Sequence, residues 1–187
     1  MPALVFPLAW NNHVRDPPLT RMHECEAMIT PHIGYIEEYG AIYFDANWKP
    51  PKLSLPTIGY IYIGRDVPDA PSNLRGKISY RVKIERILTR NELLNDSNEQ
   101  KYVPFWRYQC LHGVWPRTSP FAGQKHEPSE YWLKITEIKR LPNGVPPKNV
   151  INNHTIRFGV RVDENKIKRA LNCSVEKLMS VEYEFLK

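Results

Sequence analysis

The chain has 187 residues, of which 42% are hydrophobic, with a formal net charge of +6, a sequence pI near 9.2 and a mean hydropathy of -0.50. This balance favours one packed domain over residues 1–187. No run of about 18 apolar residues exists, and residues 1–10 lack the features of a signal peptide, which excludes a membrane span and favours a soluble cytoplasmic protein. The excess positive charge favours an anionic partner, most often nucleic acid.

The cysteines bear on redox state and metal binding. Cys25, Cys110 and Cys173 are odd in number and widely spaced, which predicts reduced buried thiols rather than disulfides. His23-x-Cys25 and Cys110-x-His112 together offer two sulfurs and two imidazoles, a set that is competent for Zn²⁺. Their spacing matches no common zinc motif, so we assign no metal ion and no other cofactor.

The chain opens with an apolar run, Ala3–Trp10, that predicts a strand. Pro7 lacks an N–H, so this strand is expected to lie at a sheet edge or to bend at that residue. Loop-forming residues follow, and Arg21–Ile29 predicts a short helix that ends before Pro31.

A pair of strands is expected next. Ile33–Tyr39 and Ala41–Asp45 flank Gly40, which would form the turn between them. Two prolines then hold the segment Asn47–Lys52 in an extended conformation.

The strongest pattern in the chain is a long β-hairpin over Thr57–Leu88. Residues 58–64 are apolar on both faces, which is typical of a central strand. Gly76–Ile87 alternates apolar residues with charged ones, which predicts a strand with one buried and one solvated face. The connection, Arg65–Arg75, is rich in turn-forming residues.

The segment that follows the hairpin is the most unusual part of the chain. Thr89–Glu92 is expected to start a short helix or an irregular segment, and residues 102–130 form a long aromatic and basic loop. Its rings are Phe105, Trp106, Tyr108, Trp115 and Phe121. A long irregular loop in a compact domain is usually functional or disordered, and this many aromatic rings argues against disorder. The alternative is that the rings fold back as a small satellite core.

Two further strands are expected in the last third of the chain. Tyr131–Leu141 alternates in the manner of a strand, and Pro142-Asn143-Gly144 closes it. His154–Asp163 forms the second, with apolar residues on one face and arginines on the other.

The C-terminal residues complete the fold prediction. Asp163 can cap a helix through Leu171, Ser174 can cap a second short helix, and a final strand starts at Val181. The whole pattern predicts an α+β protein: a curved, mostly antiparallel sheet or small β-barrel of about six strands, flanked by short helices.

Catalytic motifs are sparse. The chain contains no GxSxG, P-loop, GxGxxG or HExxH motif. The best nuclease-like candidate is Pro68-Asp69 with a later Glu-x-Lys, which begins at Glu99 or at Glu137. Such triplets occur by chance in so charged a chain, so we assign no catalytic residue and expect no enzyme; a metal-dependent nuclease domain is kept as the third hypothesis.

A binding function uses more of the residues present. The chain has five tryptophans and ten tyrosines, and Trp10, Trp48, Trp106 and Trp115 are predicted at strand ends or in loops, where rings can stack on bases. Cationic residues on strands and in the loop can follow a phosphate backbone. The predicted phosphate contacts are Lys77, Arg81, Lys83, Arg117 and Lys125. These features suggest a pocket for one extruded base ringed by cations.

The order of motifs resembles the PUA-like superfamily, and within it the EVE and YTH domains. The resemblance is carried by LAWNNH at Leu8–His13, GAIYFDANW at Gly40–Trp48, the hairpin strand that begins Gly76-Lys77, the aromatic loop with prolines, and YWLKITEIKRLP from Tyr131. It covers most of residues 1–162 as an order of elements, and the last 25 or so residues form a helical and strand extension outside it.

The resemblance implies a small barrel whose pocket receives a flipped modified base within a cage of aromatic rings. By position, Asn11 or Asn12 would contact the base edge, Tyr43 or Trp48 would form one wall, and Trp106 or Trp115 the other. The family's usual Trp-Ser or Trp-Cys pair is replaced here by Tyr43-Phe44, so the choice of wall residues stays open.

The chain also resembles the N-terminal specificity domain of an archaeal McrB-type modification-dependent restriction protein. This implies a domain that binds methylated double-stranded DNA, with N6-methyladenine as the preferred mark, and that acts with an AAA+ GTPase motor and a nuclease subunit outside this chain. The alternative is an RNA-binding PUA-like or YTH-type module that reads modified RNA.

Overall fold

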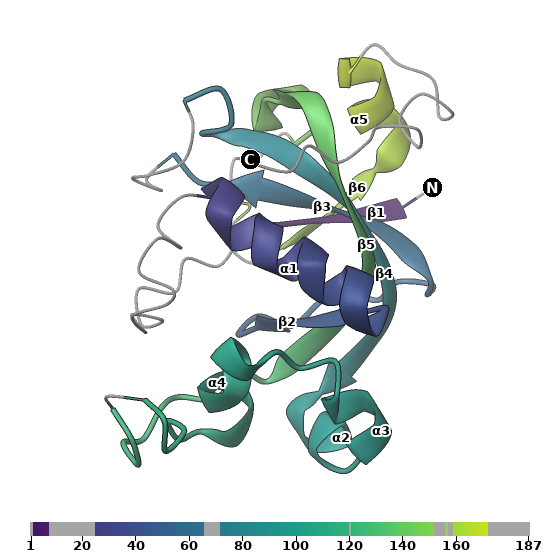
Figure 1. Ribbon diagram of the computed structural model, residues 1–187. Helices are drawn as coiled ribbons and strands as arrows, with labels where there is room; N and C mark the ends of the chain where they lie inside the picture. The colour runs from purple at the N-terminus through teal and green to yellow at the C-terminus, as the bar shows by residue number, and fades with distance from the viewer. Residues whose placement is uncertain are drawn as a thin grey trace.

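The structure is a computed structural model that describes residues 2–7, 25–65, 72–119, 121–151, 156 and 159–171 (Figure 1). Several predictions fall outside these residues: the roles of Trp10, Asn11 and Asn12, the thiol of Cys173, and the elements expected from Ser174 onward. Within the described ranges, no helix is long and apolar enough to cross a membrane.

The architecture is α+β, as predicted, and centres on one twisted sheet. Its strands are β1 (Pro2–Pro7), β2 (Ile42–Ala46), β3 (Thr57–Ile63), β4 (Lys77–Thr89), β5 (Tyr131–Val145) and β6 (Val160–Asp163). The order across the sheet is β2-β5-β4-β3-β1-β6, and only the β1–β3 pair is parallel. Among the described strands β2 and β6 are the two edges, so the sheet is open rather than a closed barrel.

The central hairpin is confirmed. β3 and β4 pair antiparallel from Thr57 opposite Ile84 to Ile63 opposite Lys77, and β3 lies inside the sheet, as its apolar faces predicted. β4 and β5 are long and run between the two ends of the molecule (Figure 1). Their ladder shifts register at three points, and such irregularities bend and twist a strand pair.

The predicted strand over Ile33–Tyr39 is wrong, because these residues belong to helix α1 (Cys25–Tyr39), which continues through Pro31. Ile29 and Ile33, one helical turn apart, are both buried in the core beneath α1. This burial outweighs the hydrogen bond that a proline removes from a helix interior. Gly40 ends the helix in the left-handed conformation, with φ 84°, rather than turning a hairpin.

Two strand predictions need correction. β1 lies between β3 and β6, so it is not an edge strand; its described residues are Pro2–Pro7, and the predicted residues 8–10 lie outside the described ranges. β5 does not stop at Pro142 but continues to Val145. In the predicted strand 154–163, β6 is described from Val160 to Asp163, and residues 154, 155, 157 and 158 lie outside the described ranges.

The remaining helices are short: α2 (Arg90–Leu94), α3 (Ser97–Gln100), α4 (Tyr108–His112) and α5 (Glu164–Leu171), with 3₁₀ turns η2 (Phe105–Arg107) and η3 (Pro147–Asn149). Both predicted caps that lie in the described residues are confirmed. The Thr89 hydroxyl and the Glu92 carboxylate form a reciprocal capping box. The Asp163 carboxylate accepts a hydrogen bond from the Asn165 N–H at 3.0 Å.

Apolar side chains gather in three clusters around the sheet. One lies between the sheet and α1 and includes Ile33, Phe44 and Ile84. A second lies on the face that α5 covers and includes Tyr60 and Ile167. The third joins α2 and α4 to the lower end of the sheet, around Tyr43 and Trp132. Both faces of the central strands are therefore covered over part of their length.

Candidate nucleic-acid interface

The segment predicted as a long irregular loop is folded into small elements. After η2 and α4, the chain makes a narrow loop closed by a bridge between Val114 and Lys125. The Trp115 N–H donates to the Gln124 carbonyl at 3.0 Å, and the His126 N–H donates to the Gly113 carbonyl at 2.9 Å. We call the described residues 105–119 and 121–126 the aromatic lobe; it projects from the lower end of the molecule below β2 (Figure 1).

The aromatic lobe exposes its rings to solvent. Phe105 is 67% exposed, and Tyr108 and Phe121 are 38% and 39% exposed. Trp115 lies against Phe121 at 5.3 Å between ring centroids and meets His126 edge-on at 5.5 Å. Ring faces that are left in water can be covered by a base, because every base offers a π-face.

Two of the predicted phosphate contacts lie in the same lobe. Arg117 and Lys125 are exposed, and neither forms an ion pair with a described carboxylate. Exposed cations beside exposed rings are the two components that proteins use to hold single strands and extruded bases. The lobe is therefore the place where the structure brings the predicted residue types together.

A buried arginine anchors the base of the lobe. Arg107 is 7% exposed, and its guanidinium forms an ion pair with Asp45 on β2 and donates to His32 Nε2 at 3.1 Å. It also lies over the ring of Phe44, 4.9 Å from the centroid. Burial lowers the pKa of Arg107 to about 10, so the guanidinium remains charged at neutral pH. The Asp45 carboxylate accepts a further hydrogen bond from the Ser129 hydroxyl at 2.7 Å.

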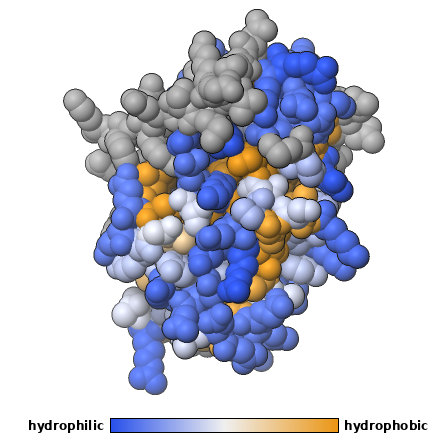
Figure 2. Space-filling model, turned by 90° about the vertical axis from the view of Figure 1, so that its right-hand side faces the viewer, coloured by the Kyte–Doolittle hydropathy of each residue, from blue (hydrophilic) through white to orange (hydrophobic). Residues whose placement is uncertain are grey.

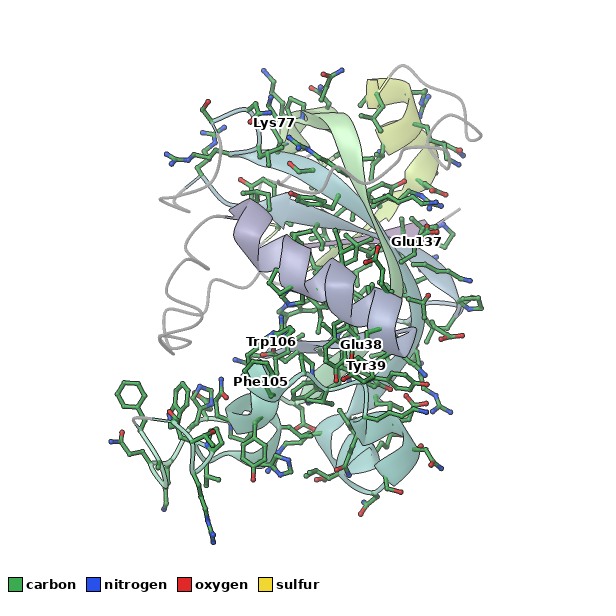
Figure 3. All side chains as sticks on the ribbon, in the orientation of Figure 1. Glu38, Tyr39, Lys77, Phe105, Trp106 and Glu137 are labelled. Atoms are coloured by element: carbon green, nitrogen blue, oxygen red, sulfur yellow. The ribbon has the colours of Figure 1, made fainter. Side chains whose placement is uncertain are left out.

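Trp106 lies at the junction of the lobe and α1. It is half-buried, with ring centroids 5.5 Å from His32, 5.7 Å from Tyr35 and 5.1 Å from Phe105, each at a steep angle. Figure 3 shows Phe105 and Trp106 side by side below α1. The indole Nε1 is buried and has no hydrogen-bond partner among the described residues. A buried donor of this kind costs about 1–3 kcal/mol when it stays unpaired.

Two other predicted wall residues lie in the core. Tyr43 is fully buried, and its hydroxyl donates to Glu99 at 2.7 Å; burial and this contact raise its pKa. Its ring offers no face to a ligand in this structure. Trp48 is half-buried against Phe6, at 6.3 Å, and lies so close to Gly159 that an added Cβ would approach its ring to 2.6 Å. Both residues therefore pack against core side chains, and neither belongs to the exposed rings of the lobe.

The predicted phosphate contacts on β4 are separated from the lobe. Lys77 lies at the opposite end of the molecule from Phe105 (Figure 3). Lys83 is exposed, on the sheet face that α5 partly covers. Arg81 is 5% exposed and lies 3.5 Å from Glu137 and 3.8 Å from Glu164, so it does not reach solvent.

The prediction of a solvated face on β4 is therefore wrong at its centre. Arg81 is buried beneath Glu164, the first residue of α5, and Ser79 is buried where its hydroxyl donates to the carbonyls of Leu74 and Lys77. The alternation in the sequence placed Tyr80, Val82 and Ile84 on one face correctly, whereas Ile78, beyond a register shift, lies in the cluster on the α5 face. The alternation carried no information on whether a distant element covers that face.

Several side chains in this region were not predicted. His32 and Tyr35 were hidden by the incorrect strand at 33–39, whereas helical spacing would have placed them one turn apart on the face beside the lobe. Asp45 and Arg107 looked like ordinary surface charges. Only the burial of both side chains shows that they form an ion pair, and no pattern of neighbouring residues in the sequence predicts this pairing.

Of the zinc-competent set, the structure describes the side chains of Cys110 and His112. Within the described ranges, no three His, Cys, Asp or Glu residues gather closely enough to hold an ion. Cys110 is buried in the cluster with Trp132, and His112 stacks on Tyr108 at 4.2 Å. Burial, together with the charge of Arg90, lowers the pKa of His112. His23 lies outside the described residues.

Comparisons of this chain with protein-family models, with curated proteins and with solved structures found no match.

Proposed function

We propose that this protein binds nucleic acid through the aromatic lobe and reads one extruded, methylated base of duplex DNA. The observation that carries the proposal is the exposure of Phe105 and Phe121 in the same lobe as the exposed Arg117 and Lys125, whose charges no described carboxylate compensates. Rings in water are costly to expose and gain about 1–3 kcal/mol for each base that stacks on them. The neighbouring cations provide the attraction to phosphate.

The geometry assigns distinct tasks to the residues. Phe105, Tyr108 and Phe121 are open enough to stack on bases, and Trp106 can form a wall behind Phe105. Arg107 does not contact the ligand. It fixes η2, and therefore the two adjacent rings, by its buried ion pair with Asp45.

The methylated base is the finer part of the proposal. A methylamino group is apolar and gains from an aromatic cage, which supports N6-methyladenine, and the likeness to EVE and YTH domains points the same way. Trp10, Asn11 and Asn12 keep their proposed roles from that likeness. A restriction system with a separate motor and nuclease would supply the context for such a reader.

An RNA ligand is the second candidate, because exposed rings and cations serve either nucleic acid. The nuclease hypothesis finds less support. Glu99 is held by Tyr43, Lys134 and Arg86, and Glu137 pairs with both Arg81 and Lys139. Both glutamates of the nuclease-like triplets are thus engaged in ion pairs that stabilise the fold.

Fluorescence anisotropy tests the proposal with three labelled ligands of equal length: a duplex with one N6-methyladenine, the same duplex unmodified, and a methylated single-stranded RNA. The parent should prefer the methylated duplex. Phe105→Ala, Trp106→Ala and Trp115→Ala should include at least one folded variant that binds this duplex about 5- to 150-fold more weakly, in line with about 1–3 kcal/mol for a lost stack. Leu55→Ala, an exposed apolar residue outside the lobe, is the control.

Charge is tested separately in the same assay. Arg117→Ala or Lys125→Ala should weaken all three ligands about equally and lower the slope of log K against log salt by roughly one unit. Preference for RNA over DNA would favour the second candidate. Equal binding of methylated and unmethylated ligands by the parent, or parent-like binding by every folded lobe variant, would contradict the proposal.

A further inference from the structure

A cavity of about 380 Å³ lies away from the aromatic lobe, where β1 and β3 begin. Its walls come from the segment before β3, from β3 and β4, and from the first residue of α5. The lining residues are Ser54, Pro56, Thr57, Ile58, Lys83 and Glu164, with Pro2 at the start of β1. Figure 2 shows the side of the molecule on which β1 begins, with apolar surface exposed between hydrophilic residues.

The sheet builds the floor of this cavity. Ile58 lies opposite Lys83 on β4 and opposite Ala3 on β1, so three neighbouring strands present side chains in one row on the same face. The Thr57 hydroxyl donates to the Pro2 carbonyl at 3.2 Å and ties the ends of two strands together. A cavity on paired strands is held in shape before any ligand arrives.

The charge available in the cavity is positive. Glu164 is 2% exposed, and its carboxylate is already neutralised: Tyr60 donates to it at 3.0 Å, and Lys168 and Arg81 lie at 3.3 and 3.8 Å. Lys83, in contrast, is exposed and pairs with no described carboxylate. An added cation would meet Lys83 unfavourably, whereas an anion would complete an ion pair at the rim.

We propose that this cavity binds a small amphipathic anion: a flat apolar body of the size of an aromatic ring or nucleobase that carries one phosphate or carboxylate group. The body would lie against Pro2, Pro56 and Ile58, and the anion would contact Lys83 and the Ser54 hydroxyl. Apolar walls with a few convergent polar groups and a volume of this size are usual for small-ligand sites. The inference does not depend on nucleic-acid binding by the lobe.

The experiment is an NMR titration of the whole chain with four probes: adenosine 5′-monophosphate, 2-naphthoate, adenosine and inorganic phosphate. Adenosine 5′-monophosphate and 2-naphthoate each combine a flat apolar body with an anionic group. At least one of them should bind about tenfold more tightly than adenosine or phosphate alone. Amide shifts should gather at Thr57, Ile58 and Lys83. Tighter binding of the nucleotide identifies a nucleotide site, and tighter binding of naphthoate identifies an organic acid site.

Variants separate this site from general attraction to a basic protein. Lys83→Ala should weaken the best probe about two- to fivefold, Lys83→Arg should retain binding, and Ser54→Trp, at an exposed position on the rim, should fill the cavity and abolish binding. Lys77→Ala, on the same strand but outside the cavity, should bind as the parent does. Shifts confined to residues 105–126, equal loss in Lys77→Ala and Lys83→Ala, or no saturable binding of either amphipathic probe would overturn the proposal.

Discussion

Two arginines are buried among the residues that the structure describes, and they are held in different ways. Arg107, at the base of the aromatic lobe, has one carboxylate partner, Asp45, supported by a histidine and an aromatic ring. Arg81, on the face of β4 covered by α5, lies between two carboxylates, Glu137 and Glu164.

The difference lies in what remains if each arginine is removed. Glu164 would keep Tyr60 and Lys168, and Glu137, whose side chain is 35% exposed, would keep Lys139 and water. Asp45, whose side chain is 10% exposed, would keep only the Ser129 hydroxyl among the contacts described for it. A buried charge is costly when its partner is lost. The cluster around Arg81 is a network in which each carboxylate has another partner, whereas Arg107 and Asp45 form a single ion pair.

The largest effect is therefore expected at Arg107. Arg107→Ala should lower the free energy of unfolding by about 3–5 kcal/mol, because it leaves the Asp45 carboxylate without a charged partner in a poorly solvated site. Urea unfolding followed by fluorescence measures this loss. The double variant Asp45→Leu with Arg107→Met should regain most of the stability, since it removes both charges together. No recovery would show that the packing of Arg107 matters more than its charge.

Arg81→Ala should have a smaller effect, about 1–3 kcal/mol, since each carboxylate keeps another partner. Denaturation in urea again provides the measurement. Glu164→Gln is the informative companion, because it should leave Arg81 paired with Glu137. A loss at Arg81 equal to that at Arg107 would remove the distinction between network and pair.

A third ion cluster, around Glu99, allows the contribution of a partly buried carboxylate to stability to be measured as a function of pH. Although burial of the Glu99 carboxyl opposes it, hydrogen bonds from Tyr43 and Lys134 lower the pKa of Glu99 below its ordinary value of 4.5. A lowered pKa means that this carboxylate stabilises the fold above the unfolded pKa, and that the contribution is lost as pH falls through the folded value. Glu99→Gln should cost about 1 kcal/mol at pH 7.

The measurement is urea unfolding of parent and Glu99→Gln between pH 3 and pH 7. The two stability curves should converge as the pH falls below about 4.5, where the parent loses the carboxylate charge. A difference that stayed constant with pH would assign the effect to packing rather than to ionisation.

The smallest effect on stability is expected at the tip of the lobe. Phe105→Ala should change the free energy of unfolding by no more than about 0.5 kcal/mol, because its ring is 67% exposed and contributes little to the core. Thermal unfolding measures this change. A large loss would mean that Phe105 supports Trp106 and the fold, and would weaken its proposed role in stacking.

Sequence alone determined the features that depend on neighbouring residues. The β3–β4 hairpin follows from two alternating runs across a polar connection, and the helix starts at Thr89 and Asp163 follow from cap chemistry. The gathering of rings and cations in residues 105–126 was visible as composition. Each of these signals is local, because the residues that cause the structure are adjacent in the chain.

Tertiary structure decided which elements are covered and by what. Pro31 lies inside a helix because Ile29 and Ile33, on either side of it, are buried in the core. Arg81 is buried because Glu164 of α5, which is distant in sequence, packs against the same face of β4. Tyr43 is buried because α2 and α4, which come later in the chain, pack against it. Burial depends on contacts between residues distant in sequence, and its free energy exceeds local propensities, so no local pattern could assign it.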